Sequence, residues 1–271
     1  MDIHLLVLDL DGTIVGSSNS VNDSVKETIA QVKSKGIEVV LATGRMYKSA
    51  KLFHEYLNLS TPIIAYNGAW LQDPLQEKLL KYQPVTPDIA RELIDYYEQS
   101  HLLSEINVHF YHQDRLYVRQ MTSESESYAR RSSVVANYHK NFRTLTQVSP
   151  TKLLAYSSNV QLIAEITQDL QKIHSSEKIY ITQSAETLIE ANHPNATKGK
   201  TTRYLAEKIM GMTSNNVMAI GDNFNDLELL QYAGIGVAMG NSHPDIQLAA
   251  KWVAPTIEED GAKIAMQKFL L

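Results

Sequence analysis

The sequence predicts an α/β fold in which a doubly wound parallel sheet carries an inserted α+β domain. Two observations lead to this prediction. Short apolar runs alternate with helical patterns towards both ends of the 271-residue chain, and polar and apolar residues alternate singly in its middle part. Strands alternating with helices are typical of a parallel sheet covered on both faces, whereas single-residue alternation indicates antiparallel strands.

Five apolar runs have the length and the aliphatic content of buried parallel strands. They are residues 5–8, 37–42, 62–65, 217–220 and 235–238, with a sixth at 252–254. Helical spacing of apolar residues separates most of them, at residues 25–35, 47–57, 200–210 and 226–232. Gly36 follows the first of these helices, where a glycine commonly ends a helix. The arrangement predicts a Rossmann-like core.

The middle of the chain has a different pattern. Residues 105–111 and 116–119 alternate around Gln113-Asp114, which indicates an antiparallel hairpin. Helical patterns at 87–99 and 160–173 and strand patterns at 152–156 and 178–183 complete this part. We therefore predict two domains, a core of residues 1–83 and 190–271 and an inserted α+β domain of residues 84–189.

Composition excludes several classes of function. The net charge of −5 offers no general attraction for nucleic acid or for an anionic membrane surface. The absence of cysteine excludes disulfides, thiolate metal sites and cysteine nucleophiles. The first residues carry no basic segment of a secretory signal, and no apolar run reaches the roughly 18 residues of a membrane span. We expect a cytoplasmic protein.

The first candidate site closes the first predicted strand. Asp9 and Asp11 are two residues apart, so strand alternation places them on the same side, at the edge of the sheet where open α/β folds bind ligands. Carboxylates held so close repel each other unless a cation or a shared proton compensates them, and hard oxygen ligands suit Mg²⁺. A simple Asp-Gly turn, ending at Gly12, is the structural alternative.

Two further strand ends carry polar groups. Thr43, Gly44 and Arg45 follow the second strand and precede a helix, where backbone amides bind anions. The guanidinium of Arg45 can hold a phosphate or a substrate oxygen with two hydrogen bonds. Taken alone, this turn is also a common way to enter a helix.

The strand at 217–220 leads into Asp222, Asn225 and Asp226. Asp222 and Asp226 are spaced so that one can bind a metal directly and the other through a water molecule or from the second shell. Asn225 offers an amide to a phosphate oxygen. Asp226 could also be merely the N-cap of the next helix, or have both roles. Lys198 supplies a cation just before the predicted helix at 200–210, where a lysine opposes the helix dipole and so lacks a structural purpose. Lys200 is the neighbouring candidate, although it has the pattern of a surface lysine.

Together these motifs resemble the haloacid dehalogenase superfamily, and in particular its Cof-type phosphatases with a large α+β cap. The matching elements are Asp-x-Asp-Gly-Thr from Asp9, Ala-Thr-Gly-Arg from Ala42, Lys198-Gly199, and Gly-Asp-x-x-Asn-Asp ending at Asp226. They occur in the family's order over nearly the whole chain. An Asn-Gly-Ala from Asn67 also matches the end of the next core strand.

The resemblance implies a phosphatase that acts on a small phosphorylated metabolite, as a monomer or homodimer. It implies that Asp9 is the nucleophile and Asp11 the general acid and base. It further implies that Mg²⁺ is held by Asp9, Asp222 and the backbone carbonyl of Asp11, with Asp226 close behind. The implied phosphate ligands are Thr43, Gly44, Lys198 and Asn225, with Arg45 and Asn67 near the substrate.

Two other functions stay open at this point. A phosphomutase similar to the phosphomannomutases would share the core and the cap, and would hold a second phosphate with cap arginines such as Arg115, Arg119, Arg130 and Arg131. A non-catalytic binding or regulatory protein could use the same scaffold, but no residue of the expected chemistry is missing. Phosphate release or its absence separates these possibilities.

Overall fold

The computed structural model describes residues 2–271, which form two compact units. The core unit comprises the chain up to Lys81 together with Thr197–Leu271, and the insert unit is Tyr82–Ala196. The predicted insert, residues 84–189, begins slightly later and ends earlier than this unit. The difference arises because β11 (Leu188–Asn192) pairs with both of its neighbours in the sheet of the insert unit.

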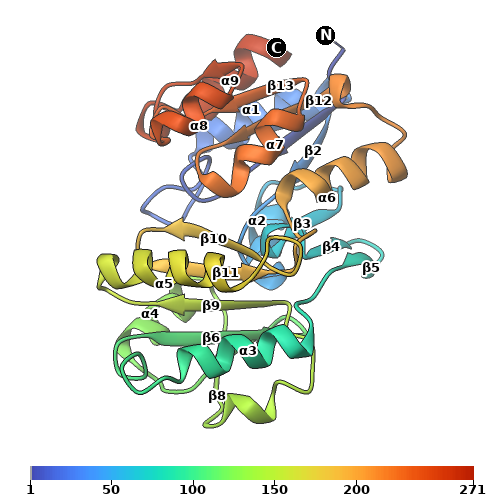
Figure 1. Cartoon of the computed structure of the whole chain (residues 1–271). Helices are drawn as coiled ribbons and strands as arrows, with labels where there is room; N and C mark the ends of the chain where they lie inside the picture. Colours follow the sequence, from blue (N-terminus) through green and yellow to red (C-terminus); the bar gives the residue numbers. More distant parts are fainter. Residues whose placement is uncertain (1) are drawn as a thin grey trace. The chain divides into compact units, whose positions relative to one another are not determined.

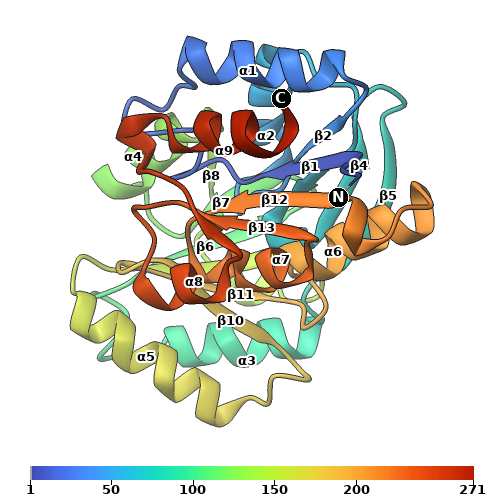
Figure 2. The ribbon, with the colours of Figure 1, turned by 90° about the horizontal axis from the view of Figure 1, so that it is seen from above.

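Five parallel strands form the main sheet of the core unit, in the order β14-β13-β12-β1-β2. Their bounds are β1 (Leu5–Leu8), β2 (Glu38–Leu41), β12 (Val217–Gly221), β13 (Ile235–Ala238) and β14 (Trp252–Val253). Helices α1 (Asp23–Ser34) and α9 (Gly261–Leu270) lie on one face, and α6 (Lys198–Tyr204), α7 (Leu227–Tyr232) and α8 (Pro244–Ala249) lie on the other (Figure 2). The central strands are buried on both faces, as their unbroken apolar runs predict.

The third predicted strand does not join the main sheet as a full member. β3 (Ile63–Ala65), which follows α2 (Tyr47–Tyr56), touches that sheet through one parallel bridge between Ala42 and Ile64. It pairs instead with the antiparallel strand β4 (Trp70–Asp73), which is followed by β5 (Lys78–Tyr82) in the same three-stranded sheet. The sequence gives little sign of β5, because its residues are partly exposed and do not alternate cleanly.

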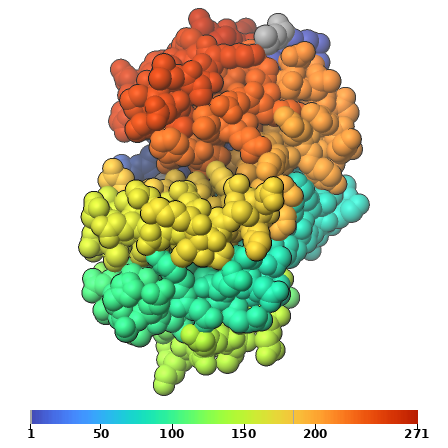
Figure 3. Space-filling view, in the orientation of Figure 1, coloured from blue at the N-terminus to red at the C-terminus, as the bar shows by residue number. Residues whose placement is uncertain are grey.

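The insert unit is a six-stranded sheet with the order β10-β11-β9-β6-β7-β8. Its other strands are β6 (Asn107–His112), β7 (Arg115–Val118), β8 (Ala136–Tyr138), β9 (Lys152–Tyr156) and β10 (Tyr180–Ala185). The predicted hairpin is present as β6 and β7, which pair antiparallel. The helices α3 (Pro87–Tyr97) and α5 (Val160–Ile173) lie side by side on one face (Figure 1), and their side chains cover that face of the insert unit in Figure 3. A shorter helix, α4 (Ser123–Arg131), was not predicted.

The α/β fold and its parallel sheet are therefore confirmed. Within residues 2–271 no helix combines the length and the apolar character needed to cross a membrane.

Candidate active site

Three strands of the core unit deliver the candidate residues to one edge of the main sheet. Asp9 follows β1 at Leu8, Thr43 follows β2 at Leu41, and Asp222 follows β12 at Gly221. Because the strands are parallel and adjacent, their carboxyl ends lie side by side. Parallel pairing alone thus brings together residues that are far apart in the sequence.

Lys198 lies between two carboxylates. Its Nζ donates to Oδ1 of Asp9 at 2.6 Å and to Oδ1 of Asp226 at 2.7 Å. The lysine is 1% exposed and both acids are buried. Burial by itself would lower the pKa of Lys198, but the charges of Asp226 and Asp9 raise it above its ordinary value, so the ammonium stays charged.

The position of Lys198 corrects the predicted start of its helix. α6 begins at Lys198 itself, with the Thr197 hydroxyl accepting a hydrogen bond from the backbone N–H of Lys200 as an N-cap. The α-helix ends at Tyr204 and continues as a π-helical turn over Leu205–Ile209. Lys200 points to solvent, so the buried cation of the site is Lys198.

Asp226 has a structural role beside its ion pair. Its Oδ2 accepts from the backbone N–H groups of Asp222 and Asn223, at 3.1 Å each. The carboxylate therefore shapes the loop that presents Asp222. Asp226 occupies the N-cap position of α7, as the sequence suggested, but its side chain does not cap that helix.

Asp222 completes a group of three carboxylates. One ligand oxygen each from Asp9, Asp222 and Asp226 lie within 4.8 Å of one another. The hydroxyl of Thr13 is 3.3 Å from Oδ2 of Asp9 and 3.3 Å from Oδ1 of Asp222, so it can donate to either. Gly12 has a φ of +82°, and a Cβ placed on it would lie 2.1 Å from Oδ2 of Asp222. The turn after β1 therefore requires glycine for two reasons, its backbone angle and the approach of Asp222.

The charges of this group fit a divalent cation. Burial raises the pKa of Asp9 to about 7 and, with the neighbouring charges of Asp9 and Asp226, that of Asp222 to about 9. Burial and the neighbouring carboxylates together outweigh the one ammonium group of Lys198, so a further positive charge would stabilise the group. The donors are all hard carboxylate oxygens, without histidine or cysteine, and this set suits Mg²⁺.

Asp11 lies outside this carboxylate group. Its side chain is 58% exposed and accepts two hydrogen bonds from Arg45, from Nε at 2.8 Å and from Nη2 at 2.6 Å. Arg45 also donates to Oδ1 of Asn19 at 2.7 Å and stacks over the ring of Phe53. These contacts fix the guanidinium and hold the carboxylate of Asp11 at the edge of the site.

The remaining predicted residues form a wall of amides. Asn225 donates from Nδ2 to Oδ1 of Asn67 at 3.0 Å, and a Cβ on Gly44 would lie 2.8 Å from that same oxygen. The backbone N–H of Asn67 donates to the carbonyl of Thr43, which links the two loops. Tyr66 and Asn67 both have left-handed backbone angles, with φ of 52° and 55°. Such angles are costly for a buried tyrosine and cluster at functional sites.

Sequence reasoning missed some of these contributors. Thr13 belongs to the quoted motif but had no role, although it bridges two of the carboxylates. Asn19 and Tyr66 carry no recognisable signal, because their roles depend on contacts with distant residues. Of the cap arginines considered for a mutase, Arg119 pairs with Glu98 at 3.6 Å and Arg130 with Glu126 at 3.8 Å.

Comparison with known proteins agrees with this geometry. The family model of haloacid dehalogenase-like hydrolases matches residues 6–266. The Bacillus subtilis 5-amino-6-(5-phospho-D-ribitylamino)uracil phosphatase YitU is 26% identical over 98% of this chain and 97% of its own. The phosphatase YwpJ of the same organism is 26% identical over 99% of this chain and 100% of its own.

Solved structures show the same fold. A haloacid dehalogenase-like hydrolase from Bacteroides thetaiotaomicron aligns with a TM-score of 0.85 and 24% identity, covering 98% of this chain and 99% of that one. The family match extends over both units, and the relatives match at nearly full length. The chain therefore belongs to the haloacid dehalogenase-like hydrolases of the Cof type, and it is a phosphatase.

Proposed function

We propose that this phosphatase hydrolyses phosphomonoesters of small metabolites in a Mg²⁺-dependent reaction through a phospho-aspartate on Asp9. The observation that carries the proposal is the buried group of Asp9, Asp222 and Asp226 around Lys198 at the carboxyl edge of the sheet. Relatives that act on small phosphorylated metabolites, such as the ribitylaminouracil phosphatase YitU, support the substrate class.

In the first step a carboxylate oxygen of Asp9 attacks phosphorus, and the bond from phosphorus to the ester oxygen breaks. Asp11 gives a proton to the departing oxygen, so that the product leaves as an alcohol. Lys198 holds Oδ1 of Asp9 at 2.6 Å, which keeps the nucleophile oriented and reduces its repulsion from the anionic phosphate. Positioning and charge compensation are the main needs of phosphoryl transfer.

In the second step water attacks the phosphoryl group on Asp9. Asp11 now accepts a proton from that water, inorganic phosphate leaves, and the carboxylate of Asp9 is restored. An acid and base placed in this way contributes roughly 10²–10⁴-fold to the rate. In the structure Asp11 is bound to Arg45, so we propose that it must leave this partner to reach the ester oxygen.

Asp9, Asp222 and Asp226 would hold Mg²⁺, with the backbone carbonyl of Asp11 as the further ligand that the resemblance implies. When bound, the ion supplies compensation of the negative charge on the carboxylates and the phosphate. Thr43, Gly44, Asn225 and Asn67 would surround the transferred phosphate, since their hydroxyl and amide groups line the adjoining wall.

The test is phosphate release from a panel of sugar phosphates, nucleotides and cofactor phosphates, with Mg²⁺ and with EDTA. We expect release that requires Mg²⁺ and is abolished by Asp9→Asn, which changes little volume. Asp88→Asn, on an exposed side chain of α3, is the matched control and should behave like the wild type. Substantial release by Asp9→Asn would exclude the aspartyl mechanism. Conversion of a hexose 1-phosphate to the 6-phosphate without release would favour a mutase.

A further inference from the structure

A fourth strand end contributes to the edge of the main sheet that carries the candidate active site. β13 ends at Ala238, beside β12 in the sheet, and the loop that follows it contains Asn241. The side-chain amide of Asn241 donates from Nδ2 to the backbone carbonyl of Gly12 at 2.9 Å. Its Oδ1 accepts from the backbone N–H of Ile257 at 3.0 Å. One exposed side chain therefore joins the turn after β1 to the segment before α9.

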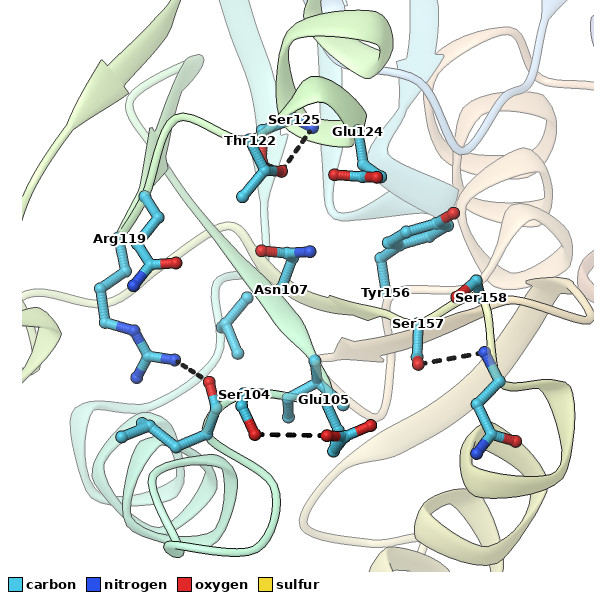
Figure 4. Close-up of a pocket in the computed structure, with 15 residues that line it drawn as sticks. Ser104, Glu105, Asn107, Arg119, Thr122, Glu124, Ser125, Tyr156, Ser157 and Ser158 are labelled. Carbon is cyan, nitrogen blue, oxygen red and sulfur yellow. Dashed lines mark hydrogen bonds between the residues drawn. The ribbon is translucent and has the colours of Figure 1, made fainter.

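The bond from Asn241 to Gly12 is not a by-product of local turn geometry. The two residues are 229 positions apart in the sequence, although both belong to the core unit. A polar pocket of the insert unit, drawn in Figure 4, contains the contrasting kind of contact. There the hydroxyl of Thr122 accepts from the backbone N–H of Ser125, three residues later, at the start of α4. Such a contact follows from the local chain, whereas the bond to Gly12 exists only in the folded core.

The loop around Asn241 is itself held in place. The side chain of Gln247 donates from Nε2 to the carbonyls of Gly240, at 3.1 Å, and of Ser242, at 3.0 Å. These are the residues directly before and after Asn241. The N–H of Gly240 also donates to the carbonyl of Pro255 at 3.2 Å. Because the backbone on both sides of Asn241 is fixed, little conformational entropy is lost when its amide forms the two hydrogen bonds.

Gly12 is the position of the turn that needs such a restraint. The approach of Asp222 and the φ of +82° require glycine here, and glycine has more backbone freedom than any other residue. Inside the turn the N–H of Gly12 donates to the carbonyl of Val15 at 3.0 Å, which holds one side of the residue. The hydrogen bond from Asn241 holds its carbonyl on the other side. The amide thus restrains the residue that clearance for Asp222 makes flexible.

Both neighbours of Gly12 belong to the proposed chemistry. Asp11 is the proposed acid and base, and the hydroxyl of Thr13 lies 3.3 Å from an oxygen of each of two carboxylates of the site. In the proposed mechanism the side chain of Asp11 leaves Arg45 to reach the ester oxygen. This movement brings the carboxyl group to the correct place only if the backbone next to it stays fixed.

We propose that Asn241 is a positioning residue of the phosphatase, which holds the turn at Gly12 so that Asp11 can protonate the departing oxygen. The inference rests on the proposed function, in which Asp11 is the acid. Asn241 acts through the backbone of the turn and not by contact with the phosphate. Its loss should therefore affect the protonation of the leaving group more than the attack of Asp9 on phosphorus.

The test is the effect of Asn241→Ala on the first step with two kinds of ester. Single-turnover transfer from an alkyl phosphate to Asp9 should slow by about tenfold, because a misplacement of about 1 Å can cost about 100-fold and the loss of one hydrogen bond should displace the turn by less. Transfer from an activated phenyl phosphate needs little protonation and should slow by less than about twofold. Loss of folded protein or of bound metal would instead slow both esters equally.

Asn216→Ala is the matched control, at the start of β12 and so at the other end of that strand from the site. Asn216 has the same pair of contacts, since Nδ2 donates to the carbonyl of Asp2 at 3.0 Å and Oδ1 accepts from the N–H of Thr213 at 3.0 Å. Both variants should lower the midpoint of urea unfolding to a similar degree, because each loses two hydrogen bonds of the same kind. Only Asn241→Ala should distinguish the two esters.

A double variant tests whether Asn241 acts through Asp11. Added to Asp11→Ala, the Asn241→Ala change should slow transfer from the alkyl phosphate by less than about twofold, because the group that it positions is already absent. A further tenfold loss would show that Asn241 acts by another route and would overturn the proposal. An unchanged rate in Asn241→Ala alone, or equal losses for the two esters, would also overturn it.

Failure of this inference and failure of the proposed function give different results. A selective loss for the alkyl phosphate in Asp11→Ala without one in Asn241→Ala overturns the role of Asn241 alone. Equal losses for the two esters in Asp11→Ala overturn the role of Asp11 as the acid, and the positioning role of Asn241 with it.

Discussion

Replacing Lys198 by methionine removes the ammonium group between Asp9 and Asp226 while keeping most of the side-chain volume. The lysine is 1% exposed and makes charge-assisted hydrogen bonds of 2.6 Å and 2.7 Å to the two acids. Loss of one partner from a buried ion pair costs about 3–5 kcal/mol. Two charge-assisted hydrogen bonds at about 1.5–3 kcal/mol each give a similar range. We expect the free energy of unfolding to fall by about this amount in the absence of metal.

The deficit should also depend on pH. The pKa of Asp9 is about 7 although Lys198 lowers it, so removal of the lysine raises it further. A carboxyl group whose pKa is higher in the folded than in the unfolded protein stabilises the fold fully at a pH below the unfolded-state pKa, near 3.8. This stabilisation is lost as the pH rises from there through the folded-state pKa. The difference between Lys198→Met and wild type should therefore grow as pH rises above about 7, by at most about 1.4 kcal/mol per pH unit.

Urea unfolding followed by tryptophan fluorescence measures this effect in the relevant unit. The chain has two tryptophans, Trp70 and Trp252, and both lie in the core unit. The control is Lys200→Met, two residues away on an exposed position, which should change stability by less than about 0.5 kcal/mol. If Lys198→Met unfolds at the same urea concentration as the control, or if its deficit is the same at every pH, the assignment of Lys198 as the buried counter-ion is wrong.

Three other predictions concern a glycine, a histidine and an acid. Gly12→Ala should weaken Mg²⁺ binding, measured by calorimetry, because the added Cβ would collide with Asp222. The control is Gly36→Ala, at a similar φ of +80° but with no atom within 4 Å of the added Cβ. It should cost only about 1–2 kcal/mol of backbone strain and leave the affinity for Mg²⁺ unchanged. Burial lowers the pKa of folded His109 to about 3, so the free energy of unfolding should fall as pH falls from 6.5 towards 3, by at most about 1.4 kcal/mol per pH unit. Urea unfolding followed by circular dichroism measures this slope, and His109→Gln should lack it. Equal slopes in the two proteins would contradict the burial of His109 as a neutral ring. Asp11→Ala should slow the first step, phosphoryl transfer to Asp9, by about 10²–10⁴-fold for alkyl phosphates and much less for an activated phenyl phosphate. Single-turnover kinetics measure this step, and equal losses for both esters would argue against the role of Asp11 as the acid.

The sequence predicts the core strands well because parallel strands buried on both faces are nearly continuous apolar runs. Residues 235–238 were predicted as a strand and form β13 with the same bounds. Strand ends then locate the candidate residues, since polar groups directly after such runs must meet at one edge. The α4 helix was not predicted because few of its residues are apolar, and its polar side lines a cavity instead of packing on the sheet.

Other features depend on contacts that one sequence does not encode locally. The pairing of Asp11 with Arg45 joins residues 34 positions apart, and the placement of Lys198 against Asp9 joins residues 189 apart. The left-handed angles of Tyr66 and Asn67 are set by hydrogen bonds to the loop at Thr43–Arg45 and not by intrinsic preference. A motif thus locates the site, while tertiary contacts determine which atoms meet.

The most direct test of the central claim is detection of the phosphoryl group on Asp9. Asp11→Asn retains the nucleophile but lacks the base for the second step, so the intermediate should accumulate when this variant is mixed with Mg²⁺ and an activated phosphate ester. We expect acid quenching and peptide mass spectrometry to find one phosphoryl group on the peptide that contains Asp9, and none in Asp9→Asn. A phosphoryl group on another residue, or turnover without any phosphorylated peptide, would contradict the proposed mechanism.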